Sequence, residues 1–110
     1  MLTKTEVLFF IKNFSKSSED PKVMVNLFFN DYSYYFAKIL EERFKKEADV
    51  IVMFNPIDDH FACLIDDILY DVVGEIEMSD DWYTWEGYQA SQPLDTERVK
   101  RYYIDKSVEN

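Results

Sequence analysis

The chain contains a single histidine, His60, at the start of the segment HFACLIDDILYDVVGE (60–75), and an imidazole is the side chain best suited to acid–base chemistry near neutral pH. If Asp66 and Asp67 form a two-residue hairpin turn, the strands on either side pair in antiparallel register. In that register His60 and Asp71 lie on one face as diagonal neighbours, within hydrogen-bonding reach. A carboxylate bonded to one imidazole nitrogen orients the ring and leaves the other nitrogen to act on a third group. The spacing therefore predicts a base and its orienting residue.

Ser33 is the candidate for the third group, because nucleophiles are commonly activated at a helix N-terminus and a helix is predicted to begin there. A serine hydroxyl needs a well-placed base and an oxyanion hole. The one cysteine, Cys63, points away from His60 on its strand and is expected to be a small buried hydrophobe. The candidate catalytic residues are thus Ser33, His60 and Asp71. The plainer alternative is a satisfied histidine at a strand end, with Asp71 closing the next strand.

Metal and cofactor chemistry is not indicated. His60 with Asp58 and Asp59 lacks the second nitrogen or sulfur ligand that zinc sites generally use, and the acidic runs lack EF-hand spacing. The only glycines are Gly74 and Gly87, so no glycine-rich phosphate loop exists. We therefore expect no metal and no cofactor.

The elements that position these residues are predicted to be helices first and strands second. Apolar side chains at helical intervals predict three helices, over 4–14, from Pro21 to just before Asn30, and over 33–45. Ser18 or Asp20 is expected to be the N-cap of the second helix, with Pro21 in its first turn. Strands are predicted over 48–54, 60–65 and 68–73, and a last helix near Asp95, its expected N-cap. The segment EIEMSDDWYTWEGY (75–88) has no clear pattern. The order predicts a single α+β domain, with N-terminal helices on a small antiparallel sheet of about three strands and a short C-terminal helix.

The order of these features resembles a known superfamily. A small residue opens the helix in NDYSYYFAKILEERF, a strand then begins with His60, and Asp71 lies on the strand after it. This order is similar to the papain-like superfamily, including its NlpC/P60 and transglutaminase-type branches. Residues 30–104 look more narrowly like small uncharacterised bacterial and phage-borne proteins in which a cysteine opens the helix before a YYFA-like stretch.

The resemblance implies a papain-like fold in which His60 is the general base and Asp71 orients it. Ser33 stands where the relatives have cysteine. A thiol is partly ionised near neutral pH and intrinsically nucleophilic, whereas a hydroxyl depends wholly on its base. The departure therefore implies a much slower or inactive site, that is, a pseudoenzyme.

Charge is the strongest compositional signal. The 22 acidic residues against 12 Lys and Arg give a formal net charge of −10. Such a chain is repelled by nucleic-acid phosphates and attracted to basic protein surfaces, although solubility alone would also favour this charge. The lone cysteine and the absence of a membrane-length apolar run lead us to expect a cytoplasmic protein with no membrane partner.

Aromatic side chains near acidic ones could anchor a partner. Tyr and Trp supply contact area with a polar tip, which suits both cores and interfaces. We expect Trp82 and Trp85 to be the more exposed pair, and candidate binding residues are Trp82, Trp85, Asp80, Asp81 and Tyr32.

Two functions follow from these observations. The first is a small acidic binding protein on a papain-like pseudoenzyme scaffold, such as a phage-type inhibitor that docks on a basic nucleic-acid-binding enzyme. The alternative is a hydrolase or acyltransferase that acts on an amide or ester through Ser33, His60 and Asp71.

Overall fold

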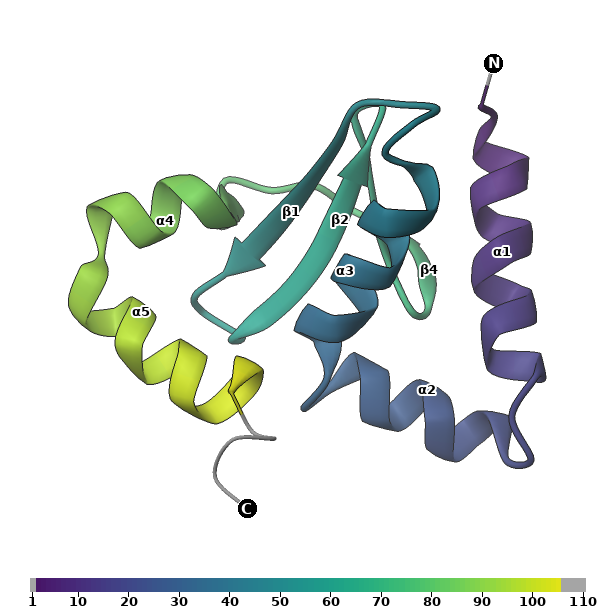
Figure 1. Cartoon of the computed structure of the whole chain (residues 1–110), viewed down its shortest axis with the longest axis horizontal. Coiled ribbons are helices and arrows are strands. Elements are labelled where there is room, and N and C mark those ends of the chain that lie inside the picture. The colour runs from purple at the N-terminus through teal and green to yellow at the C-terminus, as the bar shows by residue number, and fades with distance from the viewer. Residues whose placement is uncertain (1, 106–110) are drawn as a thin grey trace.

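A computed structural model describes residues 2–105 of the chain (Figure 1). Over these residues the chain forms five α-helices, a short π-helix and five strands. The bounds are α1 (Lys4–Lys16), α2 (Pro21–Phe29), α3 (Ser33–Phe44), β1 (Val50–Asn55), β2 (His60–Ile65), β3 (Ile68–Asp71), β4 (Gly74–Ile76), β5 (Tyr83–Thr84), α4 (Trp85–Ser91), α5 (Pro93–Val99) and the π-helix η1 (Lys100–Ile104). The α+β class and the order of helices before sheet are as predicted.

The N-terminal helices begin where their capping residues place them. The Thr3 hydroxyl accepts a hydrogen bond from the Glu6 N–H at the start of α1. Asp20 caps α2 by accepting from the Val23 N–H, and Pro21 occupies the first helical position, where its missing N–H costs nothing. Of the two caps predicted for α2, the structure therefore uses Asp20.

The five strands form one antiparallel sheet in the order β4-β3-β2-β1-β5. Asp66 and Asp67 form the turn between β2 and β3 with positive φ angles of 48° and 69°, and Ile65 pairs with Ile68 as predicted. Positive φ at both central residues is the conformation that matches the right-handed twist of a two-residue hairpin. The hairpin register from which the contact between His60 and Asp71 was predicted is thus confirmed.

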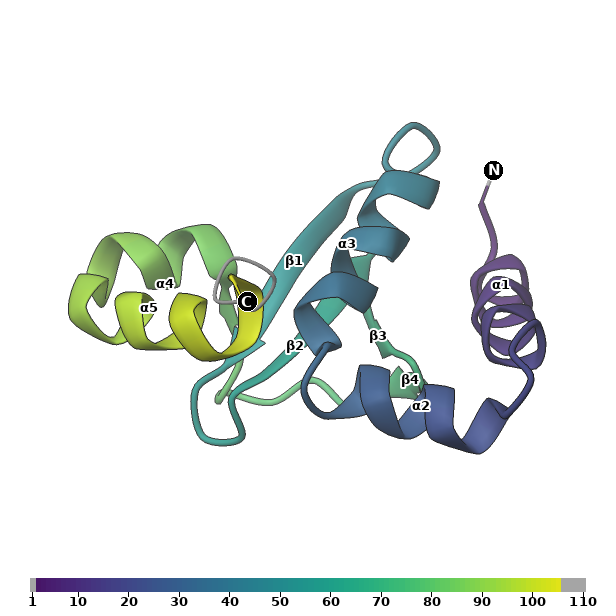
Figure 2. The ribbon, with the colours of Figure 1, turned by 60° about the horizontal axis from the view of Figure 1, so that its bottom comes forward.

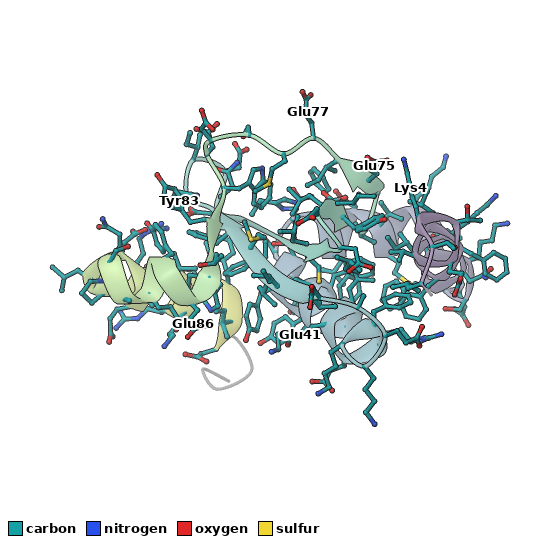
Figure 3. All side chains as sticks on the ribbon, turned by 90° about the horizontal axis from the view of Figure 1, so that it is seen from above. Lys4, Glu41, Glu75, Glu77, Tyr83 and Glu86 are labelled. Carbon is teal, nitrogen blue, oxygen red and sulfur yellow. The ribbon has the colours of Figure 1, made fainter. Side chains whose placement is uncertain are left out.

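Helices cover one face of the sheet, and a loop covers the other. The main core joins side chains of α1, α3, α4 and α5 to one face, to which Phe61 and Cys63 of β2 belong. On the other face Ala62 and Leu69 pack under Trp82. Figure 3 shows the segment between β4 and β5, which carries Glu77, crossing the sheet on the side opposite Glu41 of α3. Figure 2 shows α1 and α2 at one end of this arrangement and α4 and α5 at the other.

Two predictions about the second half of the chain were wrong. The sheet has five strands, not about three, because the three-residue β4 and the two-residue β5 add to its edges. The last α-helix begins at Pro93, so Asp95 lies in its first turn and is not its N-cap. Pro93 sets the start of this helix because its fixed φ suits the first helical position.

Within residues 2–105, no helix is long and apolar enough to cross a membrane.

Candidate functional site

His60, which is partly buried, and Asp71, which is buried, form a hydrogen-bonded pair at the open end of the β2–β3 hairpin. His60 Nε2 lies 2.9 Å from Asp71 Oδ2, and the two side chains are 12% and 3% exposed. The other carboxylate oxygen, Oδ1, accepts a hydrogen bond from the Val73 N–H at 2.8 Å. Both carboxylate oxygens are therefore engaged, and the imidazole is held through Nε2 with Nδ1 left for another group.

The backbone after β3 holds the carboxylate in place. Asp71 pairs with Gly74 across the tight β3–β4 turn, and Gly74 has a φ of +125°, a conformation that L side chains rarely adopt. The imidazole is further confined by two rings, because Phe29 at the end of α2 lies 4.9 Å and Trp82 lies 6.1 Å from it between ring centroids. The orientation of His60 is thus fixed by β3, α2 and the loop over the sheet.

Ser33 is the first residue of α3 and is 2% exposed. Its Oγ accepts a hydrogen bond from the Phe61 N–H at 3.0 Å. On β2, the residues paired with β3 run from Cys63 to Ile65, so Phe61 has no paired residue on β3. The Ser33 oxygen accepts the hydrogen bond from the Phe61 N–H in place of a backbone carbonyl. Among the described residues, no hydrogen bond joins Ser33 to His60. The structure brings the start of α3 to the strand that carries His60. The hydrogen bond of Ser33, however, goes to the backbone of Phe61, the residue after His60, and not to the imidazole.

A cavity of about 430 Å³ opens beside His60. Its lining comes from the junction of α2 and α3, the turn between β1 and β2, and η1: Phe29, Asn30, Asp31, Asp58, Asp59, His60 and Tyr103. Ser33 is not part of this lining. The space available to a ligand therefore presents an imidazole, carboxylates and two aromatic rings.

An arginine fixes one side of this cavity. The Arg98 guanidinium donates two hydrogen bonds to Asp59, at 2.8 and 3.1 Å, and a third to Asp95. The bond from Arg98, with one from the Tyr88 hydroxyl, holds the pKa of Asp95 below its usual range. Asp59 is thus paired with Arg98, which it shares with Asp95, and is fixed in position, whereas Asp58 is exposed.

Searches with the whole chain found no match among protein-family models, curated proteins or solved structures. The papain-like assignment stays a prediction.

Cys63 has the environment predicted for it. It is fully buried on the α3 side of β2, and burial raises the pKa of its thiol to about 12. A thiol in this environment is protonated near neutral pH and is a poor nucleophile. Cys63 therefore cannot replace Ser33.

The predicted binding residues do not gather in one place. Trp85 is buried against Phe54 and Phe61, so its prediction as an exposed anchor was wrong. It begins α4, and the cap from Thr84 turns it into the core. Trp82 is half-buried on the second face of the sheet.

The remaining predicted binding residues lie on different surfaces. Asp80 and Asp81 are exposed in the loop next to Trp82. Tyr32 is half-buried beside Phe28 and Tyr35, immediately before Ser33.

Sequence reasoning missed several residues of the cavity. Asp31 and Tyr103 were not among the predicted site residues. Asp58 and Asp59 were considered only as metal ligands, and over residues 2–105 no group of three or more His, Cys, Asp or Glu side chains is placed to hold a metal ion. The sequence signal for this cavity was the pair Asp58-Asp59 directly before His60. Both aspartates lie in the short turn between β1 and β2, which keeps them beside the imidazole.

Proposed function

We propose that this chain is a small acidic binding protein on a papain-like scaffold that has lost catalysis at Ser33, and that its cavity at His60 receives a cationic side chain of a basic protein. The lining of the cavity carries the proposal. Asp31 and Asp58 lie beside His60 there, together with Asp59, whose charge Arg98 partly balances, while Ser33 lies outside the lining. A concave surface with charges of one sign and low-dielectric walls concentrates the opposite charge.

The other groups in the cavity suit the same ligand. A guanidinium or ammonium donates to carboxylates in strong, charge-assisted bonds. Phe29 and Tyr103 add aromatic rings to this lining, and aromatic rings attract cations, while a neutral imidazole accepts a bond at Nδ1. The net charge of −10 steers a basic surface toward the chain before contact.

The most concrete partner is an enzyme that binds nucleic acid. Its phosphate-binding groove is basic, and a carboxylate-rich protein would occupy that groove in place of phosphates, in the manner of a phage counter-defence inhibitor.

A binding experiment with one removed charge tests the proposal. We expect a fluorescein-labelled hexa-arginine peptide to bind at low salt, to be released as salt rises, and to bind several-fold more weakly to Asp58→Asn. Glu86→Gln is the matched control, because it removes one charge from an exposed residue of α4 that is not part of the cavity lining. Equal weakening in both variants would mean that net charge alone attracts the peptide, and no binding at any salt would also refute the proposal.

A working hydrolase or acyltransferase is the second candidate, favoured by the bond between His60 and Asp71. A buried carboxylate that fixes one imidazole nitrogen is the arrangement that prepares the other nitrogen to take a proton from a hydroxyl. Ser33 would be the nucleophile. Its Oγ accepts a hydrogen bond from the Phe61 N–H, so during attack this bond would have to break or occupy the lone pair of Oγ that does not react.

Covalent labelling separates the two candidates. If Ser33 is a working nucleophile, a fluorophosphonate probe labels the wild-type chain, and both Ser33→Ala and His60→Ala abolish the labelling. If catalysis is lost, as we propose, the probe leaves the chain unlabelled under conditions that label a serine hydrolase added as an internal standard. Labelling of Ser33 that requires His60 would overturn the pseudoenzyme proposal.

A further inference from the structure

A second hollow adjoins the cavity at His60. It measures about 480 Å³ and lies between α2 and the turn that joins β3 to β4. Its lining is apolar apart from one lysine and one asparagine: Pro21, Lys22, Val25, Asn26, Phe29 and Val73. We name this hollow the α2 groove.

The α2 groove presents apolar side chains that the rest of residues 2–105 leaves partly exposed. Pro21, Val25 and Phe29 are spaced four residues apart and so lie along one face of α2. Phe29 is 41% and Val73 64% exposed. A bound apolar segment would remove these side chains from water, which favours binding.

The groove and the acidic cavity form one continuous surface. Phe29 lines both, with the groove along one side of it and Asp31 and Asp58 on the other. The carboxylates of the acidic cavity lie past the end of α2, whereas at its start Lys22 lines the groove and Asp20, which caps the helix, lies outside the lining. A bound segment with one basic end is therefore favoured with that end at the cavity.

We infer that the α2 groove holds an amphipathic segment of the basic partner, with apolar side chains against Phe29 and Val73 and a following Lys or Arg in the acidic cavity. The inference rests on the function proposed above and adds the apolar part of the recognition. The nine residues of α2 span about 13 Å, which matches about two to three turns of a helix laid along it. A second copy of this chain is a poor occupant, because each copy carries a net charge of −10.

The test uses three pools of synthetic 12-residue peptides and the ¹⁵N-labelled full chain. The first pool has degenerate apolar residues at helical spacing followed by arginines, the second has the same apolar positions replaced by serine, and the third has the arginines at the opposite end. We expect the first pool to shift the amide resonances of Val25, Phe29 and Val73 and to bind at least about tenfold more tightly than the other two. Val73→Gln should weaken the first pool about three- to tenfold. Val23→Gln is the matched control, because Val23 is 62% exposed on α2 but lies outside the groove. The affinity of this variant for the first pool should stay within about twofold of that of the wild-type chain.

The outcomes distinguish this inference from the function on which it rests. If the first and second pools bind equally, and both depend on Asp58, the acidic cavity acts alone and the groove inference is refuted. Equal effects of Val73→Gln and Val23→Gln also refute it. If no pool binds, both proposals fail. If sedimentation shows a dimer that Val73→Gln dissociates and Val23→Gln does not, a second copy fills the groove and the inference is wrong.

Discussion

Replacing Asp71 by alanine tests the central contact of the site. The substitution removes the acceptor for two donors, His60 Nε2 at 2.9 Å and the Val73 N–H at 2.8 Å. A buried donor left without a partner costs about 1–3 kcal/mol. The imidazole is nearly buried and the Val73 N–H only partly so, which places the combined loss of unfolding free energy at about 2–4 kcal/mol.

Urea denaturation followed by circular dichroism measures this loss. For a chain of this size the slope is on the order of 1–2 kcal/mol per molar, so the midpoint of Asp71→Ala should fall by about 1–3 M. Asp71→Asn keeps one acceptor oxygen and should lose about half as much. Asp67→Asn is the control: it removes a carboxylate from the exposed hairpin turn and should change stability by less than about 0.5 kcal/mol.

The stability measurement is paired with a readout of the ring itself. The ¹⁵N shifts of the neutral imidazole report which nitrogen carries the proton, and the bond to Asp71 should favour the proton on Nε2 in the wild-type chain. Asp71→Ala should shift this balance toward the other tautomer. A stability loss below about 0.5 kcal/mol in Asp71→Ala, or an unchanged tautomer balance, would refute the view that Asp71 orients His60.

Three further predictions concern the surroundings of the site. Cys63 should resist Ellman's reagent in the folded chain at pH 8 and react fully in urea. Because burial raises the pKa of its thiol from 9.0 to about 12, the stability that the buried protonated form provides is complete below pH 9 and is lost as the pH rises from there toward 12. In Cys63→Ala the free energy of unfolding should fall less between pH 9 and 12 than in the wild-type chain. Equal declines in the two chains would contradict the raised pKa of Cys63. Gly74→Ala should lower the free energy of unfolding by about 1–3 kcal/mol in urea titrations, since its new Cβ meets Leu8 only at 3.7 Å and the cost arises from a φ of +125°; an unchanged midpoint would show that the turn relaxes. Arg98→Met should lower stability by no more than about 1 kcal/mol, because the ion pair is partly exposed, yet tighten hexa-arginine binding by freeing the charge of Asp59; weaker binding would exclude Asp59 from the cation site.

The hairpin could be predicted from sequence because its signals are local. Alternation of side chains fixes which residues share a face, and the two aspartates between Ile65 and Ile68 fix the register, so the contact between His60 and Asp71 followed from counting. The caps of α1 and α2 are local in the same sense. Each rests on one side chain and a backbone N–H three residues away.

The short strands and the buried tryptophan depend on partners far away in sequence. β5 has two residues and exists only because it pairs with Met53 and Phe54 of β1, so no alternation could reveal it. Acidic neighbours suggested that Trp85 was exposed, but its spacing of three residues from Tyr88 puts both on one face of α4, against Phe54. That spacing was a readable signal once a helix was assumed.

The acidic cavity illustrates a different limit. Its carboxylates come from the junction before α3 and the turn before β2, and its far wall comes from η1, so the cavity is produced by the packing of three separate segments. A single sequence gives their charges but not their distances. The net charge predicted attraction to basic surfaces, and the cation site that we propose in this cavity would give that attraction a location.

The position of Ser33 connects the two candidate functions. As an acceptor, its hydroxyl satisfies a buried backbone N–H that the sheet leaves without a partner, and a hydroxyl serves this purpose better than a thiol, which is a weak acceptor. As a nucleophile, the same hydroxyl would have to pass its proton to His60. When Ser33 Oγ accepts the Phe61 N–H, the hydroxyl keeps its own proton. This hydrogen bond therefore stabilises the fold and is compatible with both an inactive and a catalytic serine. Serine at this helix start therefore has a sufficient structural reason to be present. Because an inactive scaffold would need serine there just as much as a working one, catalysis must be inferred from the transfer of that proton and not from the identity of the residue.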